Sequence, residues 1–208
     1  MIFLLYHHTI LSSKSGNFFR KTPYLYVKLE YKAIELEGAS LVIFPLSYIE
    51  FLTHFHGDRD FFECHEVLEE HWKQHGMERN SVWVGLIQIA VSLYHYRREN
   101  KTGALKMMDK AFQILSNKRA AVHTLGINHQ QLIAILNQCR RDMDSDIPYE
   151  FINTNLPIHD DELLTVCKER VRGLGLEWGS KNDVFDPYIV NKHIARREFS
   201  ESQLVDVK

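Results

Sequence analysis

A short stretch of the chain, residues 58–76 (DRDFFECHEVLEEHWKQHG), holds its densest group of side chains that can do chemistry. His65 and Glu69 are four residues apart, a spacing that places two side chains on one face of an α-helix. A histidine and a carboxylate at this spacing can share a hydrogen bond, hold a divalent metal ion, or act together as acid and base. The spacing therefore predicts a polar site on a helix and leaves its chemistry open.

The same stretch differs from the motif of the zinc proteases. Those enzymes use H-E-x-x-H, whereas His65 and Glu66 here begin an H-E-x-x-E pattern that ends at Glu69. His71 lies at the wrong helical phase to supply the second histidine. The pattern does not indicate a metalloprotease.

Start and stop signals predict that this stretch forms one helix. Asp60 can cap the helix, with Glu63 three residues later as in a capping box, and Gly76 is a typical stop. At 100° per residue, one face is predicted to point into the core. Its members are Phe61, His65, Leu68 and Trp72. The side chains predicted to lie largely in solvent are Glu63, Glu66, Glu70 and Lys73.

The next helix is predicted over residues 82–98, with Asn80 or Ser81 as its cap, and it is apolar nearly all round. Such a helix is typical of a buried position, and its length and polar members argue against a membrane span. The polar members lie on one stripe, namely Gln88, Ser92 and His95. Because buried polar groups need partners, this stripe is predicted to face His65 and Glu69.

The remaining periodicity predicts an all-α fold, a compact orthogonal or up-down bundle of about five to six helices over residues 44–175. Further helices are expected from Pro45, along residues 104–115, after residues 126–128, and over 160–172, with a loop at 144–157. Residues 176–208 are predicted to be a polar tail with room for a short helix.

Residues 1–43 are predicted to be an irregular extension. Alternation at 24–36 is typical of a strand that has no evident partner. An over-long start assignment for the gene explains the extension equally well.

Composition limits the classes of function. The 208 residues carry a formal net charge of −2, so non-specific nucleic-acid binding is not indicated. Cys64, Cys139 and Cys167 are far apart, which argues against a disulfide framework and favours a reducing, cytoplasmic location. The apolar start of the chain is too short to span a bilayer, so no membrane partner is expected.

The residues of the two central helices resemble a known family. The segment DFFECHEVLE at 60–69 with Trp72, then GLIQIA at 85–90 and Tyr94-His95, is similar to the domain-of-unknown-function 309 family. The similarity covers about residues 48–115, and Glu99 replaces the glycine that the family places before the following asparagine. The resemblance implies a small bacterial-type helical bundle that begins near Phe44, and it implies no particular activity.

Three functional hypotheses follow from these residues. In the first, the protein is a binding module without a cofactor, its partner an unknown protein or small molecule, and a buried cluster of His65, Glu69 and Gln88 specifies the fold. In the second, it is a metal-dependent hydrolase-like enzyme in which His65, Glu69 and His95 hold a divalent metal. Gln88 would then orient water or substrate, and Glu66 would be a base if the helix were rotated. In the third, Glu69 pairs with His65 or His95 for metal-free acid–base chemistry.

Overall fold

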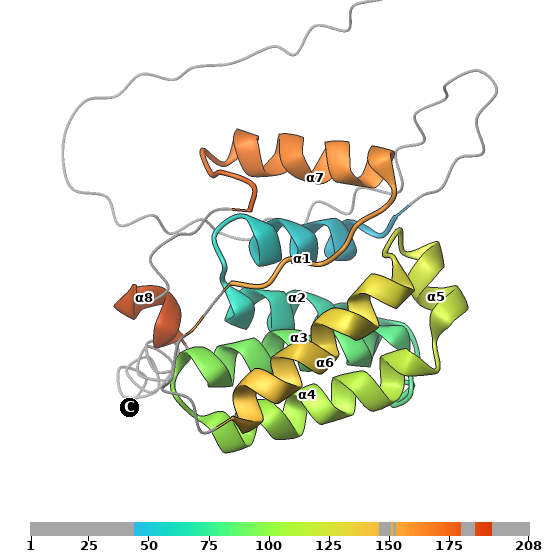
Figure 1. Ribbon diagram of the computed structural model, residues 1–208. Helices are drawn as coiled ribbons and strands as arrows, with labels where there is room; N and C mark the ends of the chain where they lie inside the picture. Colours follow the sequence, from blue (N-terminus) through green and yellow to red (C-terminus); the bar gives the residue numbers. More distant parts are fainter. Residues whose placement is uncertain (1–43, 146–150, 152, 180–185, 193–208) are drawn as a thin grey trace, which may run out of the picture. The chain divides into compact units, whose positions relative to one another are not determined.

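The computed structural model describes residues 44–145, 151, 153–179 and 186–192. The chain divides into two units, 1–43 and 44–208, and the first lies outside the described residues, together with the strand pattern at 24–36. Within the described residues every regular element is a helix, which confirms the all-α prediction (Figure 1).

Four consecutive helices form the centre of the second unit. They are α1 (Leu46–His56), α2 (Phe61–Gln74), α3 (Val82–Arg97) and α4 (Lys101–Ser116). Each packs against the next, and Figure 1 shows them following one another down the view. Because the linking turns are short, neighbours in sequence are also neighbours in space.

Four more helices complete the described part. α5 (Arg119–Thr124) leads into α6 (His129–Asp144), which packs on α4 and crosses it obliquely in Figure 1. α7 (Asp161–Gly173) packs on the outer side of α1, and α8 (Pro187–Val190) follows in the C-terminal region. Within residues 44–175 the difference from the predicted number comes from α5, which is too short to show a clear period, whereas α8 lies in the tail that was predicted to have room for a short helix.

Side-chain caps fix the starts of the main helices. Asp60 accepts a hydrogen bond from the Glu63 amide at 3.0 Å, and Ser81 accepts one from Val84 at 3.3 Å, as predicted. Asp160 does the same for Leu163 at 2.8 Å. A cap satisfies one of the free amides in the first helical turn, so these starts are encoded locally.

The buried face of α2 differs from the predicted one. Phe61 and Leu68 are buried as expected, but the positions beside them are taken by Cys64 and His71 rather than by His65 and Trp72. Cys64 donates to the Phe51 carbonyl of α1 at 3.5 Å. Packing against α1 therefore turns the helix so that His65 leaves the core.

The other apolar helices complete the core. α3 contributes buried side chains on most of its circumference, as its composition predicts. In the part of the chain that the structure describes, no helix combines the length and apolar character that a bilayer span requires.

Candidate functional site

Three neighbouring side chains on α2 form the candidate site, called here the α2 triplet: His65, Glu66 and Glu69. Their side chains are 28%, 41% and 30% exposed, respectively. The prediction of a buried cluster is therefore wrong, because the rotation of α2 carries His65 to the edge of the helix interface. The triplet is open to ligands from solvent.

The geometry of the α2 triplet centres on the two nitrogens of one imidazole. Nε2 of His65 lies 2.9 Å from Oε2 of Glu69, which confirms the predicted pairing across one helical turn. Nδ1 lies 3.1 Å from Oε1 of Glu66. One ligating atom from each residue lies within 4.8 Å of the others, a separation that could accommodate a metal ion. Each ring nitrogen thus has its own carboxylate.

A lysine completes the polar surface around the triplet. Nζ of Lys73 lies 3.0 Å from Oε1 of Glu69, while Oε2 of the same carboxylate faces His65. The hydrogen bond to Glu69 and its charge raise the pKa of Lys73. The two oxygens of Glu69 are therefore divided between two partners.

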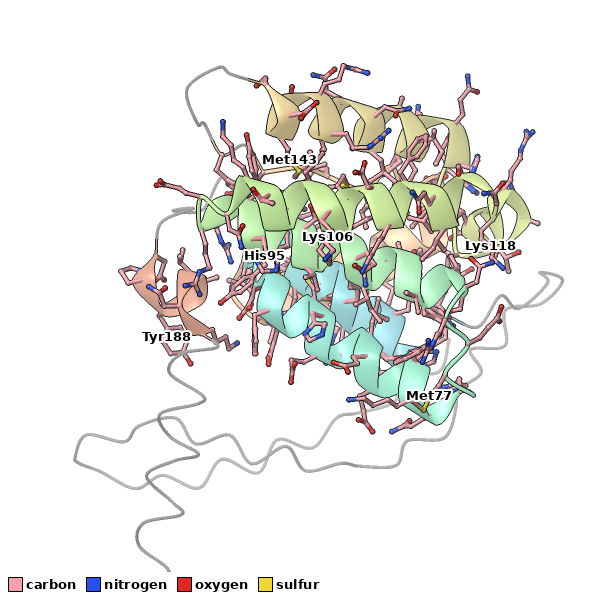
Figure 2. All side chains as sticks on the ribbon, turned by 90° about the horizontal axis from the view of Figure 1, so that it is seen from below. Met77, His95, Lys106, Lys118, Met143 and Tyr188 are labelled. Carbon is pink, nitrogen blue, oxygen red and sulfur yellow. The ribbon has the colours of Figure 1, made fainter. Side chains whose placement is uncertain are left out.

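The predicted partners on α3 do not join the triplet. His95 lies near the end of α3 (Figure 2). Its Nδ1 is 3.2 Å from the side-chain nitrogen Nδ2 of Asn100, and it is not part of the group of close ligating atoms. Ser92 donates to the Ala104 carbonyl of α4 at 2.7 Å. The structure does not bring His95 together with His65 and Glu69, as the predicted ligand set requires, since Ser92 and His95 of α3 contact other neighbours.

Gln88 shows a different feature. Its side-chain oxygen is sealed from solvent and has no hydrogen-bond partner among the described residues. An unpaired buried acceptor has a free-energy cost, so this oxygen is a place where water or a ligand group would be stabilised.

Two carboxylates near the start of α2 are buried, which the sequence did not predict. Glu63, which was predicted to be solvated, is only 4% exposed, and Asp60 is 3% exposed. Nζ of Lys192, from the C-terminal segment, contacts the carboxylate of Asp60 and lies 3.4 Å from that of Glu63. The capping-box spacing was the available sequence signal, and it gave no sign of a cation from so distant a position.

These features define a class: a small helical-bundle protein with a histidine–carboxylate surface on its second helix. Residues 48–107, which include every predicted site residue, match the domain-of-unknown-function 309 family. The chain is also 37% identical over 155 residues to the uncharacterized protein YpuF of Bacillus subtilis (strain 168), covering 74% of this chain and 88% of that protein. The chain therefore belongs to the domain-of-unknown-function 309 family. No solved structure matches the chain significantly.

The family assignment bears on the functional hypotheses. Neither the description of the family nor that of the relative names a reaction, so the comparisons give the enzyme alternative no support. The family stands as one of unknown function, and any activity has to be argued from the residues.

Proposed function

We propose that the protein is a binding domain and that its α2 triplet takes a divalent transition-metal ion with open coordination positions. The observation that carries the proposal is the position of His65 between two carboxylates on an accessible helix face. Such an arrangement assigns separate roles to the two acidic residues.

Glu66 supports the imidazole from one side. A carboxylate 3.1 Å from Nδ1 can accept a hydrogen bond from the N–H of that nitrogen, and Nε2 then offers its lone pair to a metal ion that displaces the proton shared between Nε2 and Glu69. Metal-binding histidines commonly have this outer hydrogen bond, which fixes the tautomer and raises the basicity of the ligating nitrogen.

Glu69 supplies the second ligand from the other side. Two ligands that each lie about 2.0–2.2 Å from a tetrahedral metal ion are roughly 3.4 Å apart. The present separation of 2.9 Å between Nε2 and Oε2 reaches that value with a small rotation of an exposed glutamate. Lys73 can stay on Oε1 throughout, because the metal needs only the other oxygen.

The ligand types indicate which ion would bind. Imidazole nitrogen favours zinc, copper or nickel, whereas magnesium and calcium prefer sites made of oxygen atoms. Two ligands from α2 leave the remaining positions to water, a small molecule or a side chain of a partner protein. The metal would thus be the means by which this surface binds its partner.

The cysteines support a cytoplasmic setting for this function. All three are free thiols, and burial raises the pKa of Cys64 and raises that of Cys167 to about 12. Protonated, buried thiols are poor nucleophiles and fit a reducing compartment.

Zinc titration of the tag-free protein, followed by NMR of the histidine ring nitrogens, tests the proposal. We expect the resonance of His65 Nε2 to shift saturably, and Glu66→Gln to weaken binding by about tenfold, as loss of an outer hydrogen bond does elsewhere. Glu69→Gln should weaken it at least as much.

A matched control lies on the same helix. Glu70 is exposed and hydrogen-bonds Gln74 at 2.7 Å, so Glu70→Gln should leave the His65 response unchanged. An unshifted His65 ring in the wild type would overturn the proposal, as would equal effects of Glu69→Gln and Glu70→Gln.

A further inference from the structure

A second pair of ligating side chains lies at the other end of α2, on a different face. His71 and His75 are four residues apart, and their rings stack with centroids 4.0 Å apart and planes at 26°. His71 is largely buried between α1 and α3, whereas His75 is exposed just after the end of the helix. The pair therefore combines one fixed ring with one that solvent can reach.

In both rings, the nitrogen that makes a hydrogen bond is Nδ1. Nδ1 of His75 donates to the His71 carbonyl at 2.7 Å, because a carbonyl oxygen can only accept. This bond places the proton of the neutral ring on Nδ1 and its lone pair on Nε2. Nδ1 of His71 lies 2.8 Å from the hydroxyl oxygen of Ser47 in α1, which can accept a hydrogen bond from the Nδ1–H group.

The Nε2 atoms remain for a ligand. Neither has a hydrogen-bond partner among the described residues. Trp83 holds the His71 ring from α3 through an edge contact, with centroids 4.6 Å apart and planes at 73°. One ring is thus oriented by two neighbouring helices before any ligand arrives.

We infer that His71 and His75 form a two-histidine chelate for a late first-row transition-metal ion, separate from the α2 triplet. Two nitrogens about 2.0–2.1 Å from one metal lie roughly 3.3 Å apart, and the exposed His75 ring has to turn relative to the His71 ring for the two in-plane lone pairs to meet at one ion. Imidazole ligands suit nickel, copper and zinc, and outer hydrogen bonds on Nδ1 are the usual support for such ligands.

The dipoles of the neighbouring helices do not determine whether a cation binds to His71 and His75. The carboxyl end of α2 favours a cation near His75, while the amino end of α1 near Ser47 opposes one. Because these contributions have opposite signs, the nitrogen donors carry the affinity. Water or a partner side chain fills the remaining coordination positions.

Nickel titration of the full, tag-free chain, followed by tryptophan fluorescence, tests this inference. Nickel at the pair lies beside Trp83 and should quench its emission saturably. Because His75 is exposed, His75→Gln should retain the wild-type melting temperature and lower the nickel affinity by about tenfold or more, as removal of a ligand does. Trp83→Phe should remove the larger part of the quenching.

Two controls separate this pair from other histidines. The ring of the exposed His159 lies 4.6 Å from that of His123, but among the described residues the rings that contact Trp83 are those of Tyr48 and His71, so His159→Gln should not change the quenching. Glu69→Gln, which disables the α2 triplet, should also leave it unchanged.

The outcomes distinguish the two sites. If His75→Gln leaves the quenching intact, or if the wild type shows no saturable quenching, the two-histidine chelate does not exist. The His65 ring resonances remain the readout for the α2 triplet, so either site can fail without the other.

Discussion

His56 is a buried histidine that ties stability to pH. It is 1% exposed, and its ring stacks on Trp178 with centroids 4.2 Å apart and planes at 9°. Burial lowers its pKa to about 3, with help from the charge of Arg59, and the nearby Asn155 side chain opposes the shift only in part. Neither ring nitrogen has an aligned hydrogen bond among the described residues, so the ring stays neutral in the fold.

We predict that acid destabilises the protein through His56. The folded pKa lies below the unfolded value of about 6.5, so this contribution is complete above pH 6.5 and is lost as the pH falls toward 3. Within this window, each unit by which the pH falls lowers the free energy of unfolding by up to about 1.4 kcal/mol. His56→Phe keeps the stacking and removes the titration, so its urea midpoint should fall less between pH 7 and pH 5, values that bracket the unfolded pKa of about 6.5. Parallel curves for wild type and variant would exclude His56 as the cause.

Tyr48 makes a single buried hydrogen bond that joins distant parts of the chain. Its hydroxyl donates to the Leu125 carbonyl at 2.8 Å, and burial raises its pKa well above the usual value. Tyr48→Phe leaves that carbonyl without its donor, which should cost about 1–2 kcal/mol in the free energy of unfolding. Denaturant unfolding measures this difference. Tyr188→Phe, at an exposed position, should cost nothing, and equal effects would contradict the prediction.

At the scale of elements, the contact between α3 and α4 depends on a glycine. A Cβ atom on Gly85 would lie 2.5 Å from Cδ2 of Leu115, a distance that no stable contact allows. Leu115 is fully buried, so a shift of its side chain would have to displace other core residues. Gly85 therefore sets how closely the two helices approach.

We predict that Gly85→Ala destabilises the bundle although alanine is the better helix former. The gain of about 1 kcal/mol in helix propensity is outweighed by an overpacking cost of about 1–3 kcal/mol. Gly173→Ala, near the end of α7 with nothing within 4 Å, should be neutral or stabilising. Thermal melts of both variants give the comparison.

A double variant tests the mechanism of this effect. Leu115→Val removes volume at the point of overlap, so its cost combined with Gly85→Ala should be smaller than the sum of the two single costs. Strict additivity would show that the glycine matters for some other reason.

At the scale of the whole molecule, Arg59 connects segments that are far apart in sequence. Its guanidinium donates to the Phe55 carbonyl at 2.8 Å, the Thr154 carbonyl at 3.1 Å and the Asn155 side chain at 2.8 Å. Its own carbonyl accepts from Arg97 of α3 at 2.8 Å. Burial lowers its pKa to about 10, so it keeps its charge at neutral pH.

We predict that Arg59→Gln releases the segment at residues 153–155 from the helices. The shorter side chain cannot reach all three acceptors, of which the Phe55 carbonyl is buried and the other two are half-buried, and loss of these charged hydrogen bonds should cost about 3 kcal/mol. Limited proteolysis should then cut near residues 153–155 faster than in the wild type. Arg79→Gln, at an exposed arginine, is the matched control. Equal cleavage of the two variants would show that Arg59 does not anchor the segment.

The helical class, the principal helix starts and the spacing that pairs His65 with Glu69 could all be predicted from the residues alone. These features depend on interactions within about four residues, such as a side-chain cap on the first turn or two side chains one turn apart. Asp60 and Ser81 cap their helices in any fold that keeps those helices. Helix caps and side-chain pairs one turn apart can therefore be predicted from a single sequence.

Contacts between helices, in contrast, set which face of α2 is buried and which groups meet there. Cys64 and His71 face inward because they fit against α1, a property of shape that the hydrophobic period of α2 alone does not contain. The same packing exposes the α2 triplet, brings Ser47 to His71 and keeps His95 away from the triplet. The buried Glu63 lies beside a lysine more than a hundred residues later in the chain, and no local pattern encodes such a contact.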